Sequence, residues 1–185
     1  MRTRPLVESP ALATKAVQFL CEGKSGFRMN QDEAQRVVAY LRWVSYVPEA
    51  FLYREGDGTR TSYMLLLLEG DVSVDTAASG RADRVAISVV GPGALIGEMA
   101  LLDGAPRSTS CKAITPVQAA GMSQGGLAAL VDEHPVVAFK LMTFMARSTA
   151  NRLRALGEQL HMYDQVIADL HLEIDQLRAS KEGRA

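Results

Sequence analysis

Residues 97–110 read Gly-Glu-Met-Ala-Leu-Leu-Asp-Gly-Ala-Pro-Arg-Ser-Thr-Ser, and this stretch carries most of the chemical information in the chain. Gly97 has no Cβ, so another group can approach its main chain closely. Met99 to Leu102 can form a short helix whose first N–H groups favour an anion. The guanidinium of Arg107 offers a planar fork of donors that matches phosphate oxygens and that a lysine does not reproduce. Together these residues predict a loop that binds a small anion.

Glu98 lies within the same loop and would repel an anion. Its carboxylate is therefore expected to accept a hydrogen bond from a hydroxyl group elsewhere on the ligand. One anionic group and one hydroxyl group together suggest a phosphorylated sugar ring. The alternative interpretation is that Glu98 and Arg107 simply pair with each other on a surface loop.

This stretch resembles the phosphate-binding cassette of the cyclic nucleotide-binding domain, which occurs in catabolite activator proteins, cyclic nucleotide-dependent kinases and cyclic nucleotide-gated channels. The family's pattern is Gly-Glu, an Ala-Leu pair, and Arg followed by a small residue and usually Ala. Those positions are occupied here by Gly97, Glu98, Ala100, Leu101, Arg107 and Ser108. Thr109 departs from the pattern, because it stands where alanine is usual. The resemblance implies that Arg107 binds the cyclic phosphate and that Glu98 accepts a hydrogen bond from the ribose 2′-hydroxyl.

The same resemblance implies a wider set of ligand-binding residues, namely Ile96, Gly97, Glu98, Met99, Ala100, Arg107, Ser108, Thr109, Asn151 and Arg152. Asn151 and Arg152 belong to this set because the family's helix after the β-roll covers the base of the nucleotide. An ungapped alignment with catabolite activator proteins from Arg107 onward brings these two residues to that place. Arg152 can stack on a purine or donate to its acceptors. The alternative is that both are solvated positions on the helix.

The base preference depends on the residue after the cassette arginine. By the resemblance, a threonine there favours guanine, whereas alanine gives no such help. Ser108 carries a hydroxyl but no methyl group, which fits either base. We therefore expect cAMP as the ligand, with cGMP as the competitor. A cyclic dinucleotide is disfavoured because Glu98 and Arg107 are both present.

The N-terminal residues 1–46 are predicted to form helices that pack on the following domain. One helix is expected from about Ala11 to Cys21. Asn30 is a plausible helix cap, with Glu33 three residues later. A second helix is predicted from apolar residues at helical spacing, which are Ala34, Val37, Val38, Leu41 and Val44.

Residues 47–134 are predicted to hold an antiparallel β-roll or jelly roll with a flanking helix, which makes the fold class α+β. Met64 to Leu68 is an unbroken apolar run, as in a strand that is buried on both faces. Val72 and Val74 alternate with polar neighbours. Gly56 and Gly70 lie in turn sequences and are expected to serve turn geometry.

The C-terminal part, residues 135–185, is predicted to be one long helix that follows a short helix ending near His134-Pro135. Apolar residues recur along it at alternating spacings of three and four: Leu153, Leu156, Leu160, Tyr163, Ile167, Leu170, Ile174 and Leu177. Isoleucine at a and leucine at d of such a heptad favour a coiled coil of two parallel helices. Glu173 at g can reach Arg178 at e of a second helix. The pattern predicts a homodimeric coiled coil from about residue 153, and the alternative is a helix that packs on its own domain.

Other classes of function find little support. The chain of 185 residues has a net charge of −1, so no strong overall electrostatic field attracts it to nucleic acid or to anionic lipid. His134, His161 and His171 are too far apart for a metal pair. No set of nucleophile and base is evident, so we expect neither an enzyme nor a cofactor. The longest apolar runs are too short to span a bilayer, which predicts a cytoplasmic protein without membrane contact.

The expected function is that of a stand-alone cyclic nucleotide sensor that dimerises and signals through an unknown protein effector. The chain ends at Ala185, shortly after the last heptad leucine, so we expect no helix-turn-helix and no direct DNA binding. Two alternatives stay open. One is a transcription regulator subunit that pairs with a second subunit for its output. The other is a structural dimer module with a vestigial site.

Overall fold

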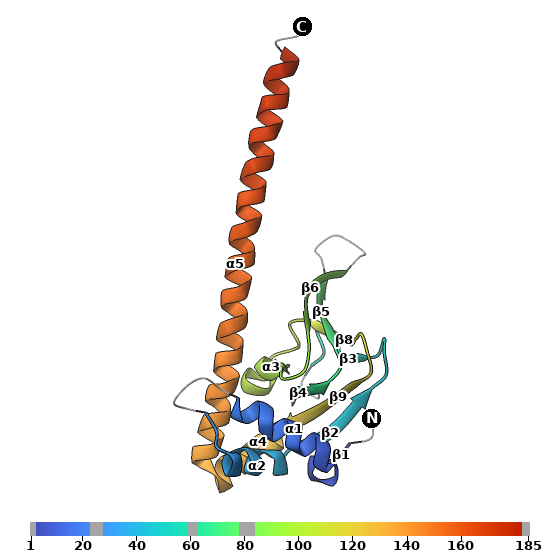
Figure 1. Cartoon of the computed structure of the whole chain (residues 1–185), viewed down its shortest axis with the longest axis vertical. Helices are drawn as coiled ribbons and strands as arrows, with labels where there is room; N and C mark the ends of the chain where they lie inside the picture. Colours follow the sequence, from blue (N-terminus) through green and yellow to red (C-terminus); the bar gives the residue numbers. More distant parts are fainter. Residues whose placement is uncertain (1–2, 23–27, 59–62, 78–83, 183–185) are drawn as a thin grey trace. The chain divides into compact units, whose positions relative to one another are not determined.

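The protein, represented by a computed structural model, is described over residues 3–22, 28–58, 63–77 and 84–182. It comprises two compact units, Met1–Met145 and Ala146–Ala185. The first unit holds two antiparallel β-sheets with helices around them, and the second is formed by the greater part of the long helix α5 (Pro135–Glu182) (Figure 1).

The two sheets form the predicted β-roll. The five-stranded sheet has the order β1-β2-β9-β4-β7, with β1 (Arg4–Pro5), β2 (Arg42–Tyr46), β9 (Val117–Ser123), β4 (Tyr63–Glu69) and β7 (Leu95–Ile96). The four-stranded sheet has the order β3-β8-β5-β6, with β3 (Phe51–Tyr53), β8 (Ser110–Ala113), β5 (Val72–Ala77) and β6 (Arg84–Val90). Every pairing is antiparallel.

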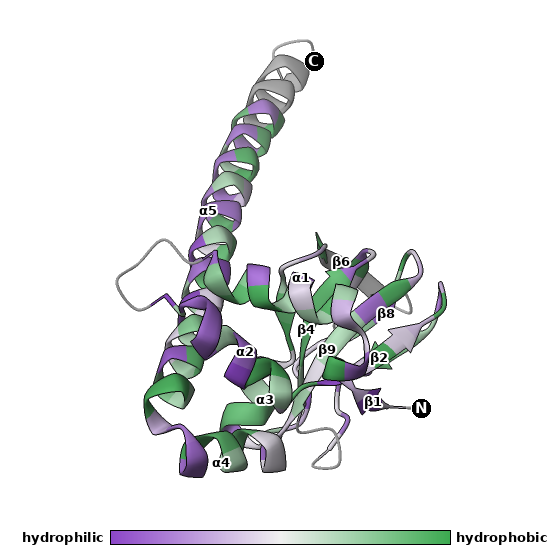
Figure 2. Cartoon of the chain, turned by 60° about the horizontal axis from the view of Figure 1, so that its bottom comes forward, coloured by the Kyte–Doolittle hydropathy of each residue, from purple (hydrophilic) through white to green (hydrophobic). Residues whose placement is uncertain are grey.

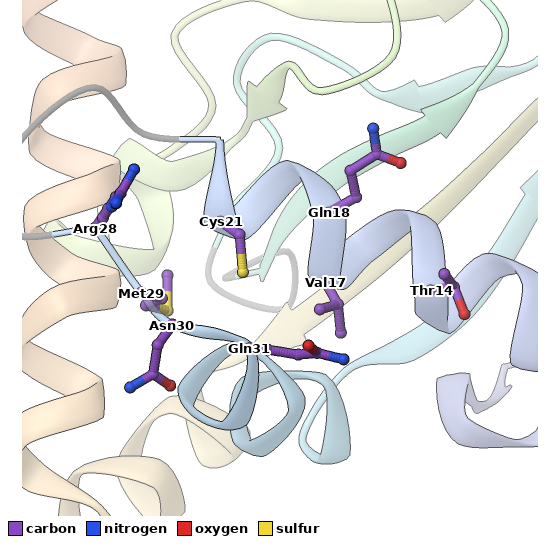
Figure 3. Close-up of a pocket in the computed structure, with 8 residues that line it drawn as sticks. All are labelled: Thr14, Val17, Gln18, Cys21, Arg28, Met29, Asn30 and Gln31. Atoms are coloured by element: carbon purple, nitrogen blue, oxygen red, sulfur yellow. The ribbon is translucent and has the colours of Figure 1, made fainter.

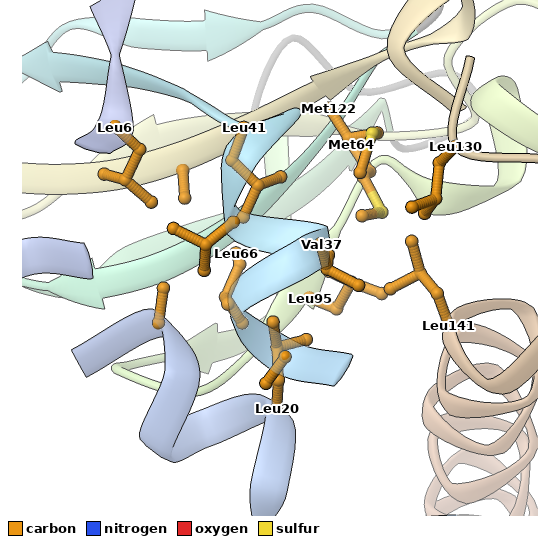
Figure 4. Packing of buried hydrophobic residues seen from close by; sticks show 14 of the residues in the cluster. Leu6, Leu20, Val37, Leu41, Met64, Leu66, Leu95, Met122, Leu130 and Leu141 are labelled. Atoms are coloured by element: carbon orange, nitrogen blue, oxygen red, sulfur yellow. The ribbon is translucent and has the colours of Figure 1, made fainter. Parts of the chain in front are cut away.

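Strand β4 is buried on both faces, as its apolar run predicts. Its side chains alternate in direction because successive residues of a strand point to opposite faces. Met64, Leu66 and Leu68 pack into a cluster with the helices. Leu65 and Leu67 pack into a second cluster between the two sheets. In Figure 4, Met64 and Leu66 lie among side chains from α2 (Gln31–Ala39) and from the beginning of α5.

The N-terminal helices begin close to their predicted starts, and α1 also ends where the sequence predicts. A 3₁₀ turn over Leu6–Glu8 leads into α1 (Pro10–Cys21). Helix α2 begins after Asn30, whose side chain accepts a hydrogen bond from the Glu33 N–H at 2.9 Å. The Glu33 carboxylate accepts in return from the Asn30 N–H at 2.9 Å, so the predicted capping box is confirmed.

The prediction of helix through Val44 is wrong. Helix α2 ends at Ala39, and Arg42–Tyr46 forms strand β2 instead. Val44 pairs with Ala119 of β9 and is 3% exposed within the cluster between the sheets. The spacing of three from Leu41 to Val44 continues the helical pattern by coincidence, whereas the β-branched and aromatic residues of Arg-Trp-Val-Ser-Tyr favour a strand.

Three further helices follow the predicted order. Helix α3 (Glu98–Asp103) lies within the cassette. Helix α4 (Gln124–Glu133) begins after a Ser123 cap, and His134 follows its last residue, close to where the sequence predicts its end. Helix α5 begins at Pro135, the position where a proline costs no helical hydrogen bond.

In the second unit, α5 exposes the predicted heptad residues. The exposed fractions are 70% for Leu153, 37% for Leu156, 65% for Leu160, 64% for Tyr163, 51% for Ile167, 51% for Leu170 and 43% for Ile174. Figure 2 shows hydrophobic and hydrophilic residues interleaved along this helix. The side chains of Leu177 and Arg178 lie outside the described residues, so their predicted part in the seam stays a prediction.

Candidate functional site

Gly97 connects β7 to α3 in a left-handed conformation, with φ +72°. A Cβ added to this residue would overlap Nη1 of Arg107 and would lie 3.0 Å from the Tyr63 carbonyl oxygen. The sequence predicted that the missing Cβ allows close approach to the main chain. The structure shows which group makes that approach, namely the guanidinium of Arg107.

The main chain of Arg107 is fixed by the turn after β3. Its N–H donates to the Asp57 carbonyl oxygen at 3.0 Å, and its carbonyl oxygen accepts from the Gly56 N–H at 2.8 Å. Gly56 adopts φ +81°, and no atom lies within 4 Å of an added Cβ, so the turn geometry requires this glycine. The predicted turn therefore also anchors the cassette.

The side chain of Arg107 is 3% exposed and contacts carbonyl oxygens and aromatic rings. Nη1 donates to the Gly97 carbonyl oxygen at 2.8 Å, and Nη2 donates to the Tyr63 carbonyl oxygen at 2.7 Å. Its Cζ atom lies 4.2 Å from the ring centroid of Tyr53 and 4.6 Å from that of Tyr63. Such contacts lower the free energy of a buried cation without cancelling its charge.

Glu98 is the first residue of α3 and is 1% exposed. Its charge and that of Arg107 both act on the hydroxyl of Tyr53. Burial raises the pKa of Tyr53 well above its ordinary value, and Glu98 raises it further while Arg107 lowers it. The structure therefore gathers a carboxylate, a guanidinium and a phenol at one place inside the β-roll.

The comparison with known proteins covers the part of the chain that holds the cassette. Residues 43–134 match the sequence model of the cyclic nucleotide-binding domain. That part of the chain belongs to this family. A crystal structure of a cyclic nucleotide-binding domain from Methylobacillus flagellatus superposes with a TM-score of 0.72 at 28% identity, covering 78% of this chain and 79% of that chain.

Two curated relatives extend the comparison. The cyclic AMP receptor protein of Thermus thermophilus is 28% identical over 131 residues, which are 71% of this chain and 57% of the relative. The CRP-like cAMP-activated global transcriptional regulator of Mycobacterium tuberculosis is 25% identical over 104 residues, which are 56% of this chain and 44% of the relative. The chain thus spans about half the length of these relatives.

The other cassette residues differ in their accessibility. Ile96 and Ala100 are buried at 1% and 5% exposure, so their side chains belong to the core. Met99 is 46% exposed, Ser108 is exposed and Thr109 is half-buried. The cassette therefore presents Met99, Ser108 and Thr109 at the surface, while Glu98 and Arg107 lie beneath it.

Asn151 and Arg152 lie on α5 in the second unit, whereas the cassette belongs to the first. The Asn151 side chain accepts a hydrogen bond from Arg154 Nη1 at 2.9 Å, within one turn of the helix. Their predicted contact with the base stays a prediction.

Sequence reasoning missed two residues of this site, Tyr53 and Tyr63. Both occur in ordinary strand sequences, where a tyrosine needs no functional explanation. A chemical argument could have found them, because an arginine buried inside a β-roll requires partners that compensate its charge. Nothing in the spacing showed that these partners would be aromatic.

A separate cavity of about 540 Å³ lies between α1 and the segment that leads into α2 (Figure 3). Val17 and Cys21 project into it from α1, opposite Met29 and Gln31. Burial raises the pKa of the Cys21 thiol, which lowers the fraction of reactive thiolate at neutral pH. Within the described ranges, no group of three His, Cys, Asp or Glu side chains is arranged to hold a metal ion.

None of the helices in the described part of the chain is both long enough and apolar enough to cross a membrane.

Proposed function

We propose that this chain is a cyclic nucleotide sensor whose ligand is cAMP in preference to cGMP. The observation that carries the proposal is the buried pair of opposite charges in the cassette, Glu98 at 1% and Arg107 at 3% exposure. In this proposal Arg107 binds the cyclic phosphate, Glu98 accepts a hydrogen bond from the ribose 2′-hydroxyl, and Ser108 and Thr109 lie at the rim. The names of the curated relatives support cAMP as the ligand.

The test is calorimetric titration of the wild type with cAMP, cGMP and a cyclic dinucleotide. Losing one charge-assisted hydrogen bond costs about 1.5–3 kcal/mol, which is one to two decades in affinity. Arg107→Leu should therefore weaken cAMP binding at least tenfold. An unchanged dissociation constant would overturn the role of Arg107, and no heat with any cyclic nucleotide would favour a vestigial site.

Arg54→Leu is the matched control. Arg54 also lies over an aromatic ring, with Cζ 3.6 Å from the Phe51 centroid, but its side chain is exposed. The same chemical change at Arg54 should leave the affinity for cAMP unaltered.

The second part of the proposal is a homodimer formed by α5. Its support is the row of exposed apolar side chains from Leu153 to Ile174. A second copy of the helix would cover these side chains and remove them from water. Nucleotide can change the dimer only if it binds one of its arrangements more tightly than another.

The third part concerns the output. We infer a non-enzymatic, cytoplasmic role in signal transduction through a protein effector. A DNA-binding subunit is a specific candidate for that effector, because the curated relatives include a transcriptional regulator. Pull-down from lysate with and without cAMP tests this, and recovery of a DNA-binding protein only with nucleotide would support the regulator alternative.

A further inference from the structure

The guanidinium of Arg107 contacts two tyrosine rings that come from different strands. Tyr53 ends β3 and Tyr63 begins β4. The distances from Arg107 Cζ to their ring centroids, 4.2 and 4.6 Å, are within the range of cation–π attraction. Neither tyrosine belongs to the cassette at residues 97–110.

Both rings are themselves fixed by hydrogen bonds. The Cys111 thiol donates to the Tyr53 hydroxyl oxygen at 3.0 Å. The Tyr63 hydroxyl donates to the Leu52 carbonyl oxygen at 2.8 Å, which ties β4 to the strand that carries Tyr53. Burial raises the pKa of both phenols, so the rings stay neutral near pH 7 and leave the charge of Arg107 intact.

We propose that Tyr53 and Tyr63 are positioning residues that hold the guanidinium of Arg107 in the orientation that receives the phosphate. This inference rests on the proposed function. An unsupported arginine side chain has many rotamers, and ordering it during binding lowers affinity. In the folded protein the two rings, together with the carbonyl oxygens of Gly97 and Tyr63, already order the guanidinium.

The competing explanation is that the two rings only fill the core between the sheets. Tyr53 is 6% exposed and belongs to that core cluster, with Tyr63 packed against it. Core filling predicts that the loss of affinity for cAMP follows the loss of stability. Positioning predicts a loss of affinity in a leucine variant that is still fully folded. Because leucine is both smaller than phenylalanine and non-aromatic, each dissociation constant is compared with the free energy of unfolding of the same variant.

The first measurement uses the nucleotide-free protein. Arg107 Cζ lies over both rings, and protons close to the face of an aromatic ring show an upfield ring-current shift. The Nε–Hε signal, from the nitrogen bonded to Cζ, should therefore lie upfield in a ¹H–¹⁵N spectrum. Tyr63→Leu should move it back toward the ordinary arginine position, and Tyr63→Phe should not. An Hε signal that is the same in all three proteins would overturn the inference, whatever the nucleotide does.

The second measurement is the dissociation constant for cAMP. Tyr63→Leu and Tyr53→Leu should each weaken binding about three- to tenfold, whereas the phenylalanine variants stay within about twofold of the wild type. Position 63 is the safer site, because Tyr63 is only half-buried and its carbonyl contact with Arg107 survives any substitution. Leucine variants that fold and bind like the wild type would overturn the inference alone, whereas a wild type that binds no cyclic nucleotide would overturn the proposed function with it.

Discussion

At the scale of single residues, the site depends on one glycine as much as on its charged groups. Gly97 has no side chain, and the guanidinium of Arg107 therefore lies against its main chain. Its φ of +72° adds a second requirement, because residues with a Cβ adopt this conformation at a cost of about 1–2 kcal/mol. Backbone strain and steric overlap can be separated by experiment, since Gly104 has a similar φ of +69° and open space around it.

Gly97→Ala should lower both stability and affinity for cAMP. The strain should reduce the free energy of unfolding by about 1–2 kcal/mol, and the displaced guanidinium should weaken binding at least tenfold. Thermal unfolding and calorimetry measure the two effects. Gly104→Ala should show the loss of stability with nearly unchanged affinity, and equal affinity losses in both variants would contradict this account.

Glu98→Gln tests the proposed hydrogen bond to the ribose. In the wild type, 2′-deoxy-cAMP should bind about tenfold more weakly than cAMP, because a buried carboxylate loses its donor. In Glu98→Gln that difference between the two ligands should shrink. The comparison needs four dissociation constants, and a 2′-deoxy penalty of the same size in both proteins would rule out the contact.

At the scale of elements, local signals were sufficient where they came from short-range chemistry. The capping box at Asn30 and Glu33, the buried run of β4 and the end of α4 at His134 all depend on neighbours in sequence, and all were predicted. At Val44 two local signals compete, the spacing from Leu41 and the strand-forming residues around it, and the pairing with Ala119, far along the chain, decides for a strand. The cassette was predictable from its motif, whereas Tyr53 and Tyr63 meet Arg107 only through the folding of the sheets.

The beginning of α5 is attached to α2 by Lys140, whose Nζ lies 2.6 Å from Oε1 of Glu33. The hydrogen bond from Lys140, with that from the Asn30 N–H, holds the pKa of Glu33 below its ordinary value. A carboxylate whose pKa is lowered by folding stabilises the folded state at pH values above its pKa in the unfolded chain, which is about 4.3. This stabilisation is lost as the pH falls through the lower pKa of the folded state.

Lys140→Met should therefore destabilise the protein near neutral pH by about 1 kcal/mol or less, since the pair is partly exposed. The difference from the wild type should be complete above about pH 5 and should shrink below about pH 4. Chemical denaturation at several pH values measures it. A difference that is independent of pH would indicate lost packing and not a lost ion pair.

At the scale of the whole molecule, the two units follow different physical rules. The first packs apolar side chains into two clusters of its own. The second, a single helix from Ala146 onward, leaves Leu153, Leu160 and Tyr163 mostly exposed. In the proposed dimer this helix would gain its stability from association, so its stability should depend on protein concentration.

Leu160→Asp should abolish the dimer, because it places a charge in the heptad seam. Light scattering after gel filtration should then give the mass of one chain of 20.0 kDa, against twice that mass for the wild type. The adjacent variant His161→Asp places the same charge at an outer position and should remain dimeric. A monomeric wild type would exclude the coiled coil.

The contacts of Arg107 with carbonyl oxygens have a consequence for mutational tolerance. Its two nitrogens donate to the main chain of Gly97 and of Tyr63, and a substitution cannot delete a main-chain oxygen. Point mutations at position 63 can alter the ring but leave the acceptor in place. A single substitution at position 63 therefore leaves this hydrogen bond of Arg107 in place. Random mutagenesis for loss of cAMP binding should return changes at Arg107 and Gly97 far more often than at Tyr63.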